Sequence, residues 1–182
     1  RRLRNCALSY LTALAEDETT ALAWAQFQAA DNMTDSQAAL ACLAELDVPQ
    51  RAEALAEFHD RWAHDALVID KWFTLQATAL RADVLGEIEQ LAQHHAFTMS
   101  NPNRVRALYA AAAGNPLAFH AADGTGYRMI ADLILELNLR NPQLAARFVP
   151  SLGRWRRVEP GRSALMRAEL ERIAAAGTLS RD

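Results

Sequence analysis

Two arginines in the stretch Phe97–Arg106, FTMSNPNRVR, have the type and spacing to bind an anionic group. Asn101 followed by Pro102 predicts a helix start, because Asn caps free amides and Pro suits the first helical position. The apolar side of that helix consists of Val105, Leu108, Tyr109 and Ala112. Arg104 and Arg106 lie roughly 90–110° to either side of it, where two cations could hold a peptide carboxylate by bidentate hydrogen bonds. By spacing alone, solvated rim charges or ion pairs with nearby Asp or Glu are the simpler explanation of such arginines.

The other chemically capable side chains do not form a recognisable catalytic site. None of the five histidines has a second His four residues away with the Glu of the H-E-x-x-H zinc device; they are His59, His64, His94, His95 and His120. Asp60, Asp65 and Asp70 recur at intervals of five, which spreads them by roughly 140° per step on a helix. We therefore predict that the chain is not itself an enzyme and holds no metal or other cofactor.

The composition favours a helical protein. Apolar residues make up 51% of the 182 positions, and Gly (7) and Pro (6) are sparse. The two cysteines, Cys6 and Cys42, show no paired spacing, so neither a disulfide framework nor a zinc knuckle is indicated. We expect a cytoplasmic protein with a single domain over residues 1–182.

Charge is distributed unevenly along the chain. Residues 1–96 carry 7 basic and 15 acidic side chains, whereas residues 97–182 carry 12 basic and 7 acidic ones. The aromatic residues sit at core spacing and are not interleaved with the arginines, which argues against nucleic-acid binding. No apolar run approaches the roughly 20 residues of a membrane span, so no membrane partner is expected. The chain begins without Met and with a helix pattern already under way, as an excised piece of a longer protein would.

Apolar periodicity predicts ten or eleven helices and no strand. The clearest patterns lie at 3–15, 20–30, 49–66, 68–77, 83–94 and 164–176, and further helices are predicted after 34, 101, 115 and 141. The turn at 123–126 precedes another helix, in which Met129, Ile130, Leu133, Ile134 and Leu137 are spaced for a core face. Turn signals separate them by roughly 12–18 residues, the rhythm of helical repeats. The predicted fold is all-α, with antiparallel helix pairs stacked as a HEAT/armadillo-like superhelical solenoid.

Several helix starts are marked by capping signals. Asn101-Pro102, Asn115-Pro116 and Asn141-Pro142 use the same device three times. Thr34 and Gln37 have the spacing of a capping box, which predicts that Thr34 caps the third helix.

Five long, irregular strings in order make the chain resemble the C-terminal helical domain of bacterial aminopeptidase N, a gluzincin zinc peptidase. They are NMTDSQAAL from Asn32, DKWFTLQA from Asp70, FTMSNPNRVR from Phe97, NPLAFHAADGTGY from Asn115 and RNPQLAAR from Arg140. The resemblance runs nearly end to end and is less distinctive over the last ~25 residues.

The resemblance implies a non-catalytic domain of a metalloprotease that removes N-terminal amino acids from peptides. Its partners would be the catalytic domain of the same polypeptide, which holds the zinc, and peptide substrates. The domain would cap the catalytic domain, close the active-site cavity and shape peptide access. By motif, Arg106 and Arg147 would face that cavity, and we add Asn101, Asn103 and Arg104 as substrate-cavity residues. A stand-alone helical-repeat scaffold that binds a peptide or protein remains the alternative.

Overall fold

The chain consists of two compact helical units. The computed structural model describes residues 1–177 and 179, and all regular secondary structure within them is helical. Unit 1 comprises Arg1–Arg81 and unit 2 comprises Ala82–Asp182. None of the described helices is long and apolar enough to cross a membrane. The prediction of one domain over residues 1–182 stays a prediction.

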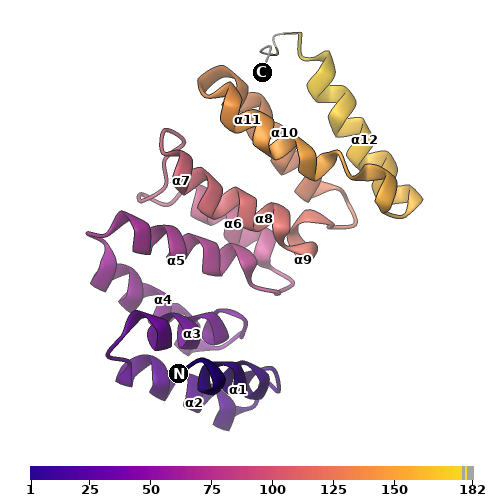
Figure 1. Cartoon of the computed structure of the whole chain (residues 1–182). Helices are drawn as coiled ribbons and strands as arrows, with labels where there is room; N and C mark the ends of the chain where they lie inside the picture. The colour runs from indigo at the N-terminus through magenta and orange to yellow at the C-terminus, as the bar shows by residue number, and fades with distance from the viewer. Residues whose placement is uncertain (178, 180–182) are drawn as a thin grey trace. The chain divides into compact units, whose positions relative to one another are not determined.

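Unit 1 is built from five helices of similar length (Figure 1). They are α1 (Arg2–Thr12), α2 (Asp17–Ala29), α3 (Met33–Ala44), α4 (Pro49–Trp62) and α5 (Ala66–Thr78). Helix α3 is central, since it packs against α1, α2, α4 and α5. The core between these helices is apolar and fully enclosed; its most buried large side chains are Phe27, Leu40, Leu43, Phe58 and Phe73.

A buried carboxylate joins the start of α3 to α1. The Asp35 side chain is 6% exposed and accepts hydrogen bonds from Asn32 (3.0 Å), Asn5 (3.0 Å) and Arg4 (2.5 Å). These donors, led by Asn32, lower the pKa of Asp35 to about 2. The charged carboxylate is therefore the form that the packed helices accommodate.

Unit 2 combines short helices with two long ones. Its elements are α6 (Val84–Ala92), α7 (Pro102–Val105), η1 (Arg106–Ala110), α8 (Ala111–Gly114), α9 (Pro116–Phe119), α10 (Thr125–Arg140), α11 (Pro142–Leu152), η2 (Trp155–Arg157) and α12 (Pro160–Ala175). Helix α10 is the central element, packing against α11, α12, α8 and α9. Of its predicted core face, Ile130, Leu133, Ile134 and Leu137 are buried, and Met129 is half-buried against the same core.

The three Asn-Pro helix starts are confirmed. The Asn101 side chain accepts hydrogen bonds from the amides of Asn103 (2.9 Å) and Arg104 (3.3 Å). Asn115 caps α9 and Asn141 caps α11 in the same way. The predicted capping box at Thr34 is wrong: Asn32 is the cap of α3 and accepts from the Asp35 amide at 3.0 Å. Asn32 caps the helix because its extended backbone directs its side chain towards the amides of the first turn, whereas Thr34 already lies inside the helix.

The helix predicted from Asn101 continues from Pro102 to Gly114, with one irregularity. Residues Arg106–Ala110 form a π-helical turn between α7 and α8. Such a turn inserts one residue into the regular ladder and shifts the face that later residues present. Leu108 remains fully buried within it, so the turn does not expose the apolar stripe.

The start of α10 lies directly on the end of α9. A Cβ atom placed on Gly126 would come within 2.1 Å of the Ala118 carbonyl oxygen and 2.6 Å of the Phe119 carbonyl oxygen. Only a residue without a side chain allows this approach. Gly126 therefore fixes the distance between α10 and the segment that carries Phe119 and His120.

We expect the buried Asp35 carboxylate to make unit 1 acid-sensitive. Its folded pKa of about 2 lies below the ordinary 3.8, so its stabilisation is complete above that ordinary value and is lost as pH falls towards 2. Asp35→Asn should lower the melting temperature at pH 7 and flatten this acid dependence. The exposed Asp47→Asn is the matched control. Equal pH profiles for Asp35→Asn and the parent would contradict the prediction.

Gly126→Ala should destabilise the chain by about 3 kcal/mol or more, since the new methyl group meets rigid backbone. Gly86 offers the control, because it lies within α6 with nothing near its added Cβ. Gly86→Ala should be neutral or stabilise by about 0.5–1 kcal/mol. Urea unfolding monitored by circular dichroism measures both, and an equal effect of the two substitutions would refute the close approach.

Candidate functional site

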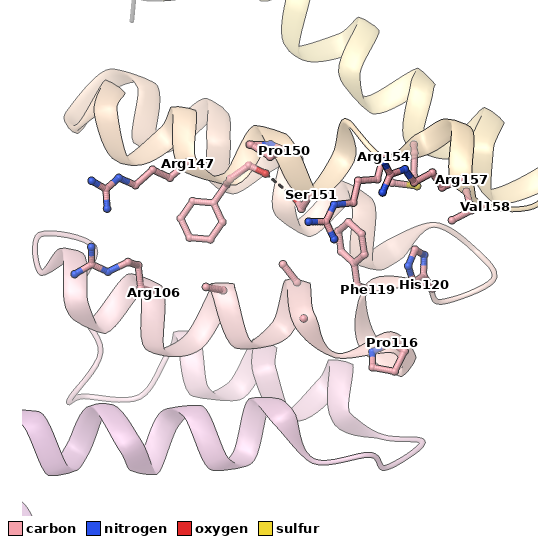
Figure 2. Close-up of a pocket in the computed structure, with 15 residues that line it drawn as sticks. Arg106, Pro116, Phe119, His120, Arg147, Pro150, Ser151, Arg154, Arg157 and Val158 are labelled. Atoms are coloured by element: carbon pink, nitrogen blue, oxygen red, sulfur yellow. Dashed lines mark hydrogen bonds between the residues drawn. The ribbon is translucent and has the colours of Figure 1, made fainter.

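Unit 2 contains a pocket of about 670 Å³ that four arginines line. We call it the arginine pocket. Its remaining walls are largely apolar, and its lining residues are Arg106, Ala110, Ala113, Gly114, Pro116, Phe119, His120, Arg147, Phe148, Pro150, Ser151, Arg154, Arg157, Val158 and Met166. Figure 2 shows the pocket between the helical segment 102–114 and α11. It joins residues that are separated by up to 60 positions in the sequence.

Within the described part of the chain, no acidic side chain lines the arginine pocket. Among residues 1–177 and 179, the guanidinium groups of Arg147, Arg154 and Arg157 make no ion pair or side-chain hydrogen bond. By contrast, on α12 Arg167 pairs with Glu171 at 2.8 Å, and Arg172 pairs with both Asp132 and Glu169. The pocket therefore concentrates positive charge that no described residue neutralises, an arrangement that attracts anions.

Arg106 and Arg147 lie at one end of the pocket, as Figure 2 shows. Arg106 begins the π-helical turn, and its guanidinium donates a hydrogen bond to the Asn103 side-chain oxygen. Arg147 comes from the middle of α11, two turns after the Asn141 cap. Both side chains are exposed. The arrangement presents two guanidinium groups from different helices to one region of space.

The other three predicted site residues do not line the pocket. The Asn101 oxygen is occupied by capping, and Asn103 accepts from Arg106. Arg104 is buried, only 6% exposed, and its guanidinium donates to the Ala96 carbonyl. It thereby ties the loop after α6 to the start of α7. The structure brings Arg106 and Arg147 together. The contacts of Asn101, Asn103 and Arg104 instead hold the start of α7 in place. A substrate-cavity role for any of the five stays a prediction.

Three pocket residues were missed at the sequence level. Arg154 and Arg157 follow the end of α11 and lie at the end of the pocket away from Arg106 and Arg147 (Figure 2). His120 lies beside them in the lining. The cluster RWRR at 154–157 was the available signal, but only folding brings it opposite the end of α9.

His120 is held in the wall by two contacts. Its Nδ1 lies 2.6 Å from the hydroxyl of the fully buried Tyr127, and Arg162 donates to its backbone carbonyl at 2.9 Å. Partial burial, with a smaller effect of the Arg162 charge, lowers the pKa of His120 below its ordinary 6.5. The ring is therefore neutral at pH 7. A phenol is a stronger acid than a neutral imidazole N–H, so Tyr127 donates to Nδ1 and the ring proton lies on Nε2.

Comparison with known proteins identifies the family of the chain. Residues 1–182 match the family described as "Domain of unknown function (DUF3458_C) ARM repeats". The chain belongs to this family. The predicted fold class, an all-α armadillo-like solenoid, is thereby confirmed together with the all-helical structure.

The curated relatives are larger proteins. The chain is 44% identical over 183 residues to aminopeptidase N of Escherichia coli and 42% identical over 183 residues to that of Caulobacter vibrioides. Each match covers all of this chain and 21% of the relative. Among solved structures, Legionella pneumophila aminopeptidase A in complex with aspartic acid is similar with a TM-score of 0.90 and 34% identity. That likeness covers 94% of this chain and 20% of the other. This DUF3458_C chain thus spans about a fifth of the length of its relatives.

We expect His120 to titrate below its ordinary pKa of 6.5, because protonation would place a cation in a partly buried wall near Arg162. Arg162→Gln should move the pKa upward, since it removes the nearby positive charge. Arg167→Gln, on the same helix but paired with Glu171, is the control. An NMR titration of the imidazole resonances measures the change. An unchanged His120 pKa in Arg162→Gln would show that the charge has no effect.

Proposed function

We propose that this chain is the non-catalytic helical domain of a zinc-dependent aminopeptidase N. In that role it caps the catalytic domain, closes the active-site cavity and limits which peptides reach it, while the parent enzyme removes N-terminal amino acids. Its partners are the catalytic domain of the same polypeptide and the peptide substrates. The cytoplasm is the proposed location.

The arginine pocket is the observation that carries this proposal. Identity above 40% along the whole chain links it to aminopeptidase N, and the pocket offers unneutralised guanidinium groups beside apolar walls. A peptide presents carbonyl oxygens and carboxylates to such donors and side chains to such walls. Guanidinium groups bind these oxygens directionally, often with two hydrogen bonds.

Contacts far from the reacting bond act mainly on substrate binding. If Arg106 and Arg147 hold a peptide equally well before and during bond cleavage, they lower KM without raising kcat. They raise kcat as well only where they improve the orientation of the reacting end. A substrate too short to reach the pocket gains neither effect.

The zinc belongs to another part of the proposed parent polypeptide. When bound there, it would polarise the scissile carbonyl and activate water. The chain contains no H-E-x-x-H motif, and no residue of the arginine pocket is proposed to hold the metal. The work of this chain is to bind and position the peptide and to restrict access.

An add-back experiment tests the domain's role. The parent enzyme truncated before Arg1 would be assayed on an alanine anilide and on tetra-alanine, with and without this chain. We expect the added chain to restore activity or peptide selectivity while being inert alone. A folded truncated enzyme that behaves identically with and without a demonstrably docked chain would instead favour the stand-alone scaffold.

In the intact parent enzyme, Arg147→Ala should raise KM for tetra-alanine by about tenfold, the effect of losing one hydrogen bond to a charged group. KM for the single-residue alanine anilide should stay unchanged, because that substrate does not extend to Arg147. Arg140→Ala removes an equal charge from the end of α10, outside the pocket, and serves as control. Equal changes for the two substrates in Arg147→Ala would contradict the proposed contact.

A further inference from the structure

The arginine pocket has a second cationic end that the family resemblance did not indicate. We propose that Arg154 and Arg157, together with the neutral imidazole of His120, bind a carboxylate of a peptide whose preceding residues lie along the pocket towards Arg106 and Arg147. This inference rests on the proposed function and deepens it, because it names the chemical class of substrate that the pocket retains best.

The turn after α11 directs both arginines into the pocket. Arg154 and Arg157 are three residues apart across η2, and the Arg157 amide donates to the Arg154 carbonyl at 2.9 Å. In a 3₁₀ turn, side chains three residues apart point the same way. Trp155 packs against the core of unit 2, and the Arg156 guanidinium covers its ring at 4.3 Å. The turn thus uses its middle residues for anchoring and its outer arginines for the pocket.

The cations at this end are free to accept an anion from outside. Neither Arg154 nor Arg157 makes an ion pair within the described part of the chain, and no carboxylate lines the pocket. Arg162 is already committed to Glu159 (3.4 Å) and to the His120 carbonyl. The Nε2 proton of neutral His120 adds a third donor of the wall. Two guanidinium groups and one neutral N–H suit a carboxylate, which accepts up to four hydrogen bonds.

The walls and the length of the pocket suit an extended peptide. Phe119, Phe148 and Met166 line it and supply apolar surface for side chains. Arg106 and Ala113 are seven residues apart on one wall, a rise of roughly 10 Å along a helix. An extended peptide covers that length in about three residues. A tri- or tetrapeptide segment can therefore contact the Arg106–Arg147 end while its carboxylate lies at the Arg154–Arg157 end.

The test compares peptides that differ only in the carboxylate, using the intact parent enzyme. Three peptides are compared. Tetra-alanine has a free C-terminal carboxylate, its C-terminal amide has no carboxylate, and the amide of Ala-Ala-Ala-Asp has a carboxylate only on its side chain. We expect KM of the neutral amide to exceed that of tetra-alanine by about tenfold. If the KM of the Asp peptide is as low as that of tetra-alanine, the site also binds acidic side chains. If it is as high as that of the neutral amide, the site binds only a C-terminal carboxylate.

The variant Arg154→Gln/Arg157→Gln should bring the KM ratio of amide to free acid close to one. Arg154→Lys/Arg157→Lys should recover part of the preference, since it restores charge without the bidentate geometry. Arg128→Gln/Arg140→Gln removes the same net charge from α10 outside the pocket and should leave the ratio unchanged. Melting curves show whether each variant folds. If the glutamine variant does not fold, the KM ratio of the lysine variant is compared with that of the parent enzyme.

An unchanged ratio in the folded glutamine variant, or an equal loss in the α10 control, would overturn the assignment. The Arg147→Ala result keeps the two proposals apart. If Arg147→Ala raises KM for tetra-alanine while the glutamine variant leaves the ratio intact, the carboxylate site fails and the proposed function stands. If neither variant has an effect, both fail.

Discussion

Side-chain capping by asparagine is the interaction on which the site in unit 2 depends. Asn101, Asn115 and Asn141 each accept hydrogen bonds from free amides of the helix that follows. With Pro in the first helical position, each cap fixes the residue at which its helix begins. The position of a residue around a helix follows from that start, so the caps decide that Arg106 and Arg147 reach the same pocket.

Positive charge is treated differently in the two parts of unit 2. Along α12, arginines pair with carboxylates three or four residues away or on α10, and such surface pairs add little stability. Around the pocket, Arg147, Arg154 and Arg157 have no acidic partner among residues 1–177 and 179. Clustered cations repel one another, so the unpaired arrangement costs folding energy that pairing would relieve. A site that receives an anion explains that cost, and this is the physical link between the fold and the proposed peptide binding.

Close packing at the α9–α10 junction fixes the position of His120 in the pocket wall. Gly126 lets α10 rest on the Ala118 and Phe119 carbonyls, and Tyr127 then reaches His120. Arg162 holds the same loop from α12. The part of the pocket wall that carries His120 is therefore held in place by one glycine and one phenol of α10 and by one guanidinium of α12.

Periodicity and capping residues in the sequence determined the all-α class, the core face of α10 and the three Asn-Pro starts, because these depend on neighbours within a few positions. The long matching strings also determined the family. Tertiary structure alone decided the rest. Arg104, expected at the border of the apolar stripe, is buried because the loop carbonyl of Ala96 meets it. The turn after α11 lies opposite the end of α9, although the two segments are over 30 residues apart in the sequence. This proximity brings Arg154, Arg157 and His120 into one pocket, and no local sequence pattern encodes it.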